Sequence, residues 1–303
     1  MIYNFIIFFI EGLKRRFNRL LFSIIKKSYK KNLSPYSRYN DVLTDKWYLY
    51  HEYEEQVNNF IDIYSIEKKY KNFFIDIGAN IGFTTISNHE KFDQIFCFEP
   101  NQLVYNILKT NTRLHCNTDK ITLFDVGLGS SKGNYELKIP KHNFGGAFIE
   151  KNNRYDIETL LKKEGFNTYD EKDFLIENIV IEDAEFLINN VFSKLNTSSK
   201  GVIKIDVEGY EIQIIELILK NIDCHSVAII FENLSTMKPR ELGDILQNTD
   251  FEIKETYLLS GPDSPIGKIL NNQYKKELKL VDYDNMKKFP EDCMDVVINL
   301  SKN

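Results

Sequence analysis

Cysteine, proline and tryptophan are scarce in this chain of 303 residues, which has four cysteines, seven prolines and one tryptophan. No two cysteines have the close spacing of a zinc site or of a CxxC redox motif. The pattern therefore excludes those two kinds of site and is typical of reduced thiols in a cytosolic protein. We accordingly expect the protein to be cytoplasmic.

A long hydrophobic run is also missing. The apolar stretch at the amino terminus is about ten residues long and stops at Glu11 and the pair Arg15–Arg16, whereas a helix that spans a bilayer takes about 20 apolar residues. A secretory signal would place positive charge before its apolar part and a small-residue cleavage site after it, but here the charge comes after. A membrane span and a cleaved signal are both disfavoured.

Positive charge is spread unevenly along the chain. Residues 1–31 hold eight lysines and arginines and one acid, while residues 32–303 hold 31 basic and 43 acidic residues, a net charge of −12. A nucleic-acid-binding protein would carry its basic patch on the folded domain, so we expect no nucleic-acid partner.

The basic segment 1–31 is amphipathic. Beyond Gly12 its apolar residues recur at the spacing of one helix face, and basic residues fill most of the remaining positions. Such a helix can lie flat on an anionic membrane with its lysines and arginines at the phosphates. We therefore predict peripheral contact with the inner face of the membrane through residues 1–31. The alternative is a helix that docks on its own domain or on a second subunit.

After a helical connector at 32–70, apolar runs alternate with helical patterns. Several runs, such as 73–77 and 201–207, are nearly all apolar, as expected for strands that are covered on both faces. The alternation implies a parallel sheet with helical crossovers on both sides. The last two apolar runs, at 251–259 and 295–301, have no long helix between them. This suggests an antiparallel strand at one edge of the sheet. We therefore expect one α/β domain at 71–303.

Two segments of this domain are predicted in more detail. The residues from about Gln102 to His115 are expected to form a helix, with Asn101 as its cap. The apolar run 121–128 leads to an insertion, through about residue 150, that is expected to be rich in strands and contains glycines.

A glycine-containing loop, DIGANIG (76–82), follows the first of these strands and precedes a predicted helix near 82–90. In such sheets ligands bind beyond the carboxyl ends of the strands. Gly78 and Gly82 let the backbone turn tightly and approach a ligand closely. The N–H groups at the start of a helix favour an anionic group. The loop therefore predicts a ligand that carries an anionic group.

Two ligand classes use this arrangement. A dinucleotide site takes GxGxxG, but the middle and last glycines of that pattern are missing from GANIGF (78–83). The alternative, S-adenosylmethionine (SAM), has no phosphate; its carboxylate can accept the N–H groups, and its sulfonium favours carboxylate and carbonyl oxygens. Glu99 ends the next strand, 23 residues after Asp76, where an acid can accept hydrogen bonds from a ribose. Both ligands carry that ribose, so Glu99 indicates a nucleoside without choosing between them.

Further motifs follow in order along the chain, namely FEP (98–100), VGLGS (126–130), NFGG (143–146) and IKIDVEGYE (203–211). Together with DIGANIG they resemble the FkbM family of SAM-dependent methyltransferases, and the resemblance covers about residues 73–303. It implies a Rossmann-like class I methyltransferase domain. Such a domain has a seven-stranded, mostly parallel sheet with one antiparallel strand and helices on both faces.

The resemblance also implies a reaction and a set of cofactor residues. The reaction is methyl transfer from SAM to oxygen, and many relatives act in surface-polysaccharide or lipopolysaccharide assembly. The expected acceptor is therefore a glycan or glycolipid hydroxyl. By motif, the methionine end of SAM would be held by Asp76, Gly78, Asn80 and Gly82, its ribose by Glu99, and its adenine by Asp125, or by Val126 or Gly127 instead.

Carboxylates at the ends of later strands are the candidates for chemistry. A sugar hydroxyl is a weak nucleophile, so a positioned base should remove its proton. Asp206, which ends the fourth strand, is the first candidate and Glu208 the second, with Glu232 on the same rim at the end of the fifth strand. The three could alternatively hold a divalent cation, although we expect no metal. Lys204, inside the fourth strand, is placed to neutralise a nearby acid.

Two other functions stay open. One is a dinucleotide-dependent sugar-modifying enzyme on the same sheet, which the broken GxGxxG pattern disfavours. The other is a SAM-binding scaffold module without catalysis, against which the carboxylates at 206, 208 and 232 argue only weakly.

Overall fold

The computed structural model describes residues 35–37, 54–232, 239–260, 278–283 and 293–302. The segment 1–31, for which membrane contact is predicted, lies outside the described residues. The sequence from Tyr36 to Asn303 forms a unit by itself that holds every element below. Of the connector predicted at 32–70, the part described from residue 54 onward is helical. Within the described ranges, no helix is long and apolar enough to cross a membrane.

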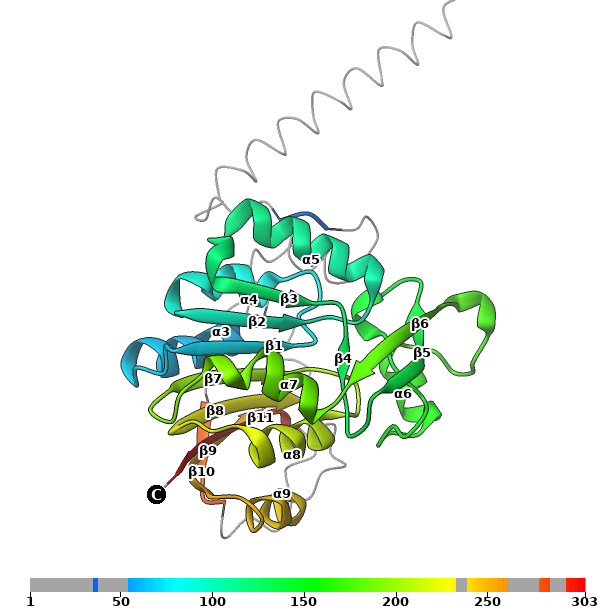
Figure 1. Cartoon of the computed structure of the whole chain (residues 1–303). Coiled ribbons are helices and arrows are strands. Elements are labelled where there is room, and N and C mark those ends of the chain that lie inside the picture. Colours follow the sequence, from blue (N-terminus) through cyan, green and yellow to red (C-terminus); the bar gives the residue numbers. More distant parts are fainter. Residues whose placement is uncertain (1–34, 38–53, 233–238, 261–277, 284–292, 303) are drawn as a thin grey trace, which may run out of the picture. The chain divides into compact units, whose positions relative to one another are not determined.

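A mostly parallel sheet of eight strands forms the centre of this unit, in the order β10-β9-β11-β8-β7-β1-β2-β3 (Figure 1). Strands β3, β2, β1, β7 and β8 are mutually parallel. Strand β11 runs antiparallel between β8 and β9, and β10 runs antiparallel to β9. The strands are β1 (Phe73–Ile77), β2 (Gln94–Phe98), β3 (Ile121–Phe124), β7 (Lys200–Ile205), β8 (Ser226–Glu232), β9 (Phe251–Ser260), β10 (Leu278–Val281) and β11 (Cys293–Lys302).

The predicted α/β fold with a mostly parallel sheet is confirmed, but the strand count differs. Seven strands in the order β3-β2-β1-β7-β8-β11-β9 match the expectation, with β11 as the antiparallel one. Strand β10 is an eighth strand and a second antiparallel one, at the edge. It has only four residues, too few for an alternating pattern to stand out in the sequence.

Helices cover both faces of the sheet. The helices on the main sheet are α3 (Glu55–Asp62), α4 (Phe83–Asn88), α5 (Gln102–His115), α7 (Ala184–Asn190), α8 (Glu211–Asn221) and α9 (Pro239–Leu246), and α6 (Ile157–Lys163) lies in an insertion. The short helices are the π-helix η1 (Ile63–Glu67) and the 3-10 helices η2 (His89–Lys91), η3 (Thr118–Lys120), η4 (Phe144–Gly146), η5 (Glu171–Asp173) and η6 (Phe192–Lys194). Helix α5 has the predicted bounds, and the predicted cap is confirmed: the Asn101 side chain accepts the N–H groups of Leu103 and Val104 at 3.1 and 3.4 Å.

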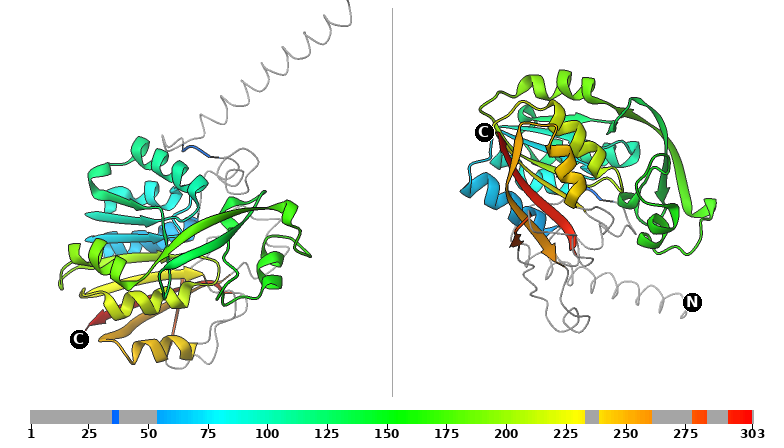
Figure 2. Two further views of the ribbon diagram at one scale, coloured as in Figure 1. Left: turned by 45° about the vertical axis from the view of Figure 1, so that its right-hand side comes forward. Right: turned by 90° about the horizontal axis from the view of Figure 1, so that it is seen from below.

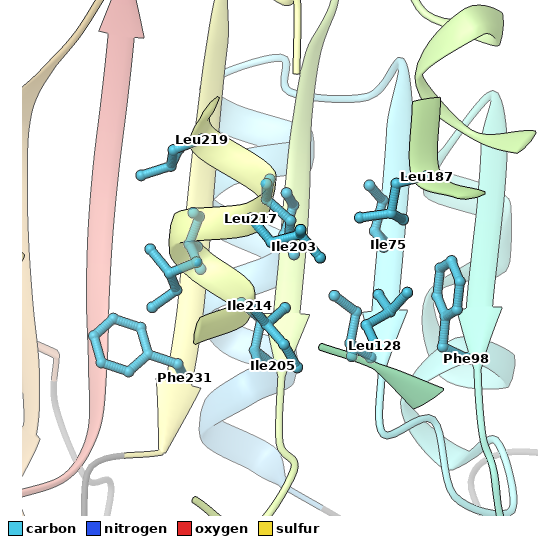
Figure 3. Close-up of a cluster of buried hydrophobic side chains, with 14 of the residues drawn as sticks. Ile75, Phe98, Leu128, Leu187, Ile203, Ile205, Ile214, Leu217, Leu219 and Phe231 are labelled. Atoms are coloured by element: carbon cyan, nitrogen blue, oxygen red, sulfur yellow. The ribbon is translucent and has the colours of Figure 1, made fainter. Parts of the chain in front are cut away.

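Alternation along the strands divides the core into two layers. In β7, Ile203 and Ile205 face a layer built with α7, α8 and α9, whereas Val202 faces a layer built with α3 and α5. Figure 3 shows Ile214 and Leu217 of α8 against Ile203 and Ile205. Each such side chain is almost fully buried and stabilises the fold by about 1.5–3 kcal/mol.

An insertion between β3 and α7 forms a second, smaller sheet beside the carboxyl ends of the parallel strands (Figures 1 and 2). Its three strands, in the order β4-β6-β5, are β4 (Gly127–Leu128), β5 (Gly133–Pro140) and β6 (Phe174–Glu182). The strands and glycines were expected, but helix α6 between β5 and β6 was not. The insertion stands where ligands are expected to bind.

Candidate active site

The loop after β1 turns through three residues in the left-handed region, Gly78 (φ 76°), Asn80 (φ 51°) and Gly82 (φ 88°). A Cβ atom on Gly78 would lie 1.9 Å from the carbonyl oxygen of Asp206, at the end of β7. Glycine is therefore required there both by the backbone angle and by the close approach of two strand ends.

The N–H groups of residues 78–82 all donate within the protein. Their acceptors are the Phe98 carbonyl oxygen for Gly78 and Ala79, Glu99 Oε2 for Asn80, Asn80 Oδ1 for Ile81 and the Ala79 carbonyl oxygen for Gly82, at 2.8 to 3.0 Å. These hydrogen bonds shape the loop and orient Glu99. The anionic group was predicted at the N–H groups that start the following helix, which are not among these donors.

Glu99 is fixed through both of its carboxylate oxygens. Oε2 accepts the N–H of Asn80 and Oε1 accepts the N–H of Asn101, each at 2.9 Å. Burial raises the pKa of Glu99 to about 7, although the two backbone hydrogen bonds act in the opposite direction. Each oxygen keeps a second lone pair, and Glu99 lines the cleft described next, so it can accept from a ligand hydroxyl.

A cleft of about 740 Å³, part of it open to solvent, lies between this loop, the end of β7 and the insertion. Of the predicted site residues, Gly78, Asn80, Glu99, Asp206 and Glu208 line it. Its other walls come mainly from the insertion and are largely apolar, with Leu128, Leu137, Phe144, Ala147, Phe148, Ile149 and Ile181 among them.

Four predicted site residues do not line the cleft. Asp76 is fully buried behind the loop, where its Oδ2 accepts the Thr85 hydroxyl at 2.7 Å. Gly82 precedes α4 and packs on Leu108. Asp125 is exposed because β3 ends at Phe124, and the alternative named from the sequence, Gly127, lines the cleft instead.

Glu232, the fourth of these residues, joins a carboxylate cluster with Asp206 and Glu208. Oxygen atoms of the three side chains all lie within 4.8 Å of one another. Asp295 of β11 stands opposite Glu232 in the sheet register. Burial and neighbouring carboxylates both disfavour the ionised form of a carboxyl group, so a carboxyl group at this rim can keep its proton.

Lys204 neutralises acids at this rim, as the sequence predicted. Its Nζ atom donates to Asp206 Oδ2 at 3.0 Å and lies 3.9 Å from Asp76 Oδ1. Burial acts to raise the pKa of Asp206, but the ammonium groups of Lys204 and Lys163 outweigh it and hold the pKa below its ordinary value. Asp206 is therefore ionised at neutral pH.

Glu208 behaves differently from Asp206. Burial and the carboxylates of Glu232 and Asp206 raise the pKa of Glu208 to about 8, against the attraction of the Lys163 ammonium. Its backbone also lies in the left-handed region (φ 44°), which is unusual for glutamate. Two adjacent carboxylates with pKa values pushed apart are suited to different tasks.

Lys163, at the end of α6, is a residue of this cluster that the sequence did not reveal. Its Nζ atom donates to both oxygens of Glu208 at 2.7 Å and to Glu232 Oε2 at 2.6 Å. It is one of two adjacent lysines at the end of a short helix within the insertion, and no local pattern distinguishes it from Lys162. The one available signal was the presence of an acid-rich strand end that needs a cation.

A family model for the methyltransferase FkbM domain matches residues 76–253, more than half of the chain. This chain belongs to the FkbM methyltransferase family. It is a SAM-dependent methyltransferase, as the motifs predicted. None of the curated proteins compared with this FkbM methyltransferase matches it.

The FkbM methyltransferase is also similar to solved structures of other methyltransferases. Magnesium protoporphyrin IX methyltransferase of Synechocystis PCC 6803, with bound SAM, is 7% identical over 90% of this chain and 88% of that chain, with a TM-score of 0.43. Precorrin-6y C5,15-methyltransferase of Geobacter metallireducens is 9% identical over 83% and 90%, with a TM-score of 0.39. TrmK of M. capricolum, with S-adenosylhomocysteine, is 11% identical over 82% and 68%, with a TM-score of 0.38.

The residues of the cleft fit SAM. Glu99 has acceptor capacity for the ribose, the apolar side chains of Leu128 and Ile181 suit the flat face of adenine, and the ionised Asp206 favours a cation. When bound, SAM supplies a methyl group on a positively charged sulfur.

Proposed function

We propose that the protein is an O-methyltransferase that acts on a hydroxyl of a sugar, glycan or glycolipid intermediate, in surface-polysaccharide or lipopolysaccharide biosynthesis. The observation that carries the proposal is the pair Asp206 and Glu208 in one cleft, one ionised and one with a raised pKa. A hydroxyl acceptor needs a group that removes its proton, and carboxylates also accept hydrogen bonds from neighbouring hydroxyls.

The two carboxylates take different roles in this proposal. Asp206, held ionised by Lys204, provides a fixed negative charge in the cleft. Glu208, with a pKa raised to about 8, takes the proton from the acceptor hydroxyl, because a base whose pKa lies near the working pH is the more effective. This assignment reverses the order of candidates given by strand position alone.

The remaining walls suit a sugar ring, which presents hydroxyls at its edge and C–H groups on its faces. Phe144 of the NFGG loop is partly buried and lines the cleft, and Ala147 and Phe148 follow it. These apolar side chains can cover a C–H face while the carboxylates bind the hydroxyls. The Tyr210 hydroxyl donates to the Lys151 carbonyl oxygen and so joins the end of β7 to the insertion.

The test is transfer of a labelled methyl group from SAM into a crude glycan and lipid extract, followed by mass and linkage analysis of the product. We expect label in a sugar O-methyl ether with the wild-type protein and a rate of labelling lower by about 100-fold or more with Glu208→Gln. Label in an N-methyl product, or in no product under conditions where SAM binds, would contradict the proposal.

A dinucleotide-dependent reaction is separated from methyl transfer by thermal unfolding with SAM, S-adenosylhomocysteine or NAD. A ligand at about 100 times its dissociation constant adds about 2.7 kcal/mol of stability. We expect stabilisation by both sulfur nucleosides and not by NAD. A SAM-binding scaffold would be stabilised in the same way but would transfer no label.

We further propose that residues 1–31 bind the membrane peripherally and bring the enzyme to a lipid-linked acceptor. The support is the sequence pattern of a basic, amphipathic helix. Deletion of residues 1–31 should move the protein from the membrane fraction to the soluble fraction of cells. Unchanged partitioning of the truncated protein would favour docking on the protein itself.

A further inference from the structure

The carboxyl end of α6 contacts the carboxylate cluster directly. Lys163 makes three hydrogen bonds of 2.6–2.7 Å to Glu208 and Glu232, which end or follow strands β7 and β8. All three side chains are largely shielded, with exposed fractions of 26%, 10% and 14%. Ion pairs with this degree of shielding are screened less by salt than surface pairs are.

The cluster needs this cation. Without it, Glu208 would lie within 4.8 Å of two other carboxylates, on a backbone already in the left-handed region. Lys204 is engaged with Asp206 on the other side. The Glu208 side chain is therefore fixed at its backbone end by the strained main chain and at its carboxylate end by Lys163. If the ammonium were removed, repulsion from Glu232 would displace the Glu208 carboxylate.

We propose that Lys163 is a positioning residue of the reaction: its ammonium holds the Glu208 carboxylate in the cleft and ties the insertion to the ends of β7 and β8. The proposal rests on the proposed function, in which Glu208 accepts a proton. Lys163 acts through Glu208 and Glu232 and does not line the cleft itself.

The next residue along the chain, Glu164, contacts the 143–146 loop, which forms part of the cleft wall. Glu164 Oε2 accepts the side-chain N–H of Asn143 at 2.9 Å. A Cβ atom on Gly146 would lie 2.2 Å from the Glu164 carboxyl group, so a larger residue there would displace this side chain from its present position. The end of α6 thus contacts two parts of the cleft wall. Lys163 holds Glu208, the proposed base, and Glu164 holds the 143–146 loop.

The chain offers a matched control on the same helix. Lys162 is 71% exposed at its side chain and pairs only loosely with Glu158, at 3.6 Å one turn away. Such a surface pair contributes about 0–1 kcal/mol to stability. Lys162→Met therefore removes the same charge from α6 as Lys163→Met, with the same small change in side-chain length, and does not touch the cluster.

The experiment compares Lys163→Met, Lys163→Arg and Lys162→Met in the full chain. Turnover is measured as transfer of the labelled methyl group from SAM into the glycan and lipid extract, SAM affinity by calorimetry and folding by thermal unfolding. We expect Lys163→Met to lower kcat by at least about tenfold, because displacement of a reacting group by about 1 Å can cost about 100-fold. SAM affinity should change by less than about twofold. Lys163→Arg should recover most of the loss, and Lys162→Met should match the wild type.

A second readout separates positioning from a merely structural role. Lys163→Ala leaves room for a small amine, so ethylammonium should restore part of its turnover and should not affect Lys162→Ala. Wild-type kcat in folded Lys163→Met, or equal losses in the Met and Arg variants with no amine rescue, would overturn the proposal. If Lys163→Met does not fold, Lys163→Gln replaces it under the same criteria. Failure of the proposed function would appear separately, as absence of sugar O-methylation by the wild type.

Discussion

The two sides of the cleft are held together in different ways. On the side of β1 and β2, Glu99 is fixed by backbone N–H groups 19 and 2 residues away in the sequence. On the side that carries Glu208, the fixing group is Lys163, 45 residues away, and it belongs to the insertion. Backbone hydrogen bonds persist through most side-chain changes, whereas an ion pair is lost by one substitution. In the proposed reaction, the contact to the cofactor ribose is thus fixed by backbone groups of the main domain, whereas the side of the cleft that would bind the acceptor depends on the insertion.

The largest expected effect is a loss of turnover when the carboxylates on the proposed acceptor side of the cleft are substituted. Glu208→Gln should lower turnover by about 100-fold or more while SAM still binds, because removal of a general base costs about that much. Asp206→Asn should lower turnover by a similar factor, because it removes the fixed negative charge that is proposed to lie beside the reacting groups. Single-turnover kinetics with labelled SAM, together with calorimetry, measures both quantities. Full activity in both variants would reject the assignment of these carboxylates.

Glu99→Ala tests the side of the cleft that is proposed to bind the cofactor. Loss of a carboxylate that can bond the ribose should weaken SAM binding by about 1.5–3 kcal/mol, or roughly 10- to 150-fold. Asp125→Ala, at an exposed position outside the cleft, is the control and should bind SAM like the wild type. Calorimetry measures both, and undiminished affinity in Glu99→Ala would remove Glu99 from the cofactor site.

A stability comparison sharpens the role of the insertion. Gly209 (φ 99°) has Asn153 Oδ1 only 2.0 Å from the position of a Cβ, whereas Gly165 (φ 80°) has nothing within 4 Å. Gly165→Ala should cost about 1 kcal/mol from backbone strain alone, and Gly209→Ala about 2–3 kcal/mol because the clash adds to it. Urea titration measures the difference. Equal losses would show that the 153–209 contact does not anchor the insertion.

The smallest expected effect is a shift in pH dependence. In the proposed reaction the deprotonated form of Glu208 is the active one, so kcat should rise with pH through about 8 and level off above it. The charged groups facing Glu208 are Lys163, Glu232 and Asp206. Glu232→Gln removes one negative neighbour, which lowers the pKa of Glu208 and should move the rise to lower pH by about half a unit to one unit. A shift to higher pH would contradict this electrostatic account.

Much of the fold could be predicted from local patterns in the sequence. The bounds of α5, its Asn101 cap and the nearly apolar strands β1, β7 and β8 followed from periodicity, capping and burial on both faces. Strand β10 and helix α6 did not, because short elements at an edge or in an insertion lack a periodic signal. Their existence depends on what they pack against.

The candidate site divides in the same way. The glycine loop, Glu99 and the strand-end acids were visible because each follows directly from a strand end. The sequence could not show that the loop N–H groups are satisfied internally, that Asp125 faces solvent, or that Glu208 and not Asp206 has the raised pKa. Each of these depends on neighbours brought in from other segments.

By itself, then, the sequence determined that this chain folds around a parallel sheet with a nucleoside site at the ends of its strands, since period, glycine position and acid spacing are local properties. Only the tertiary structure decided which carboxylate can take a proton and which lysine holds it. The charge state of a buried acid depends on the distances to groups 2 to 69 residues away along the chain, and those distances exist only once the insertion has packed on the sheet.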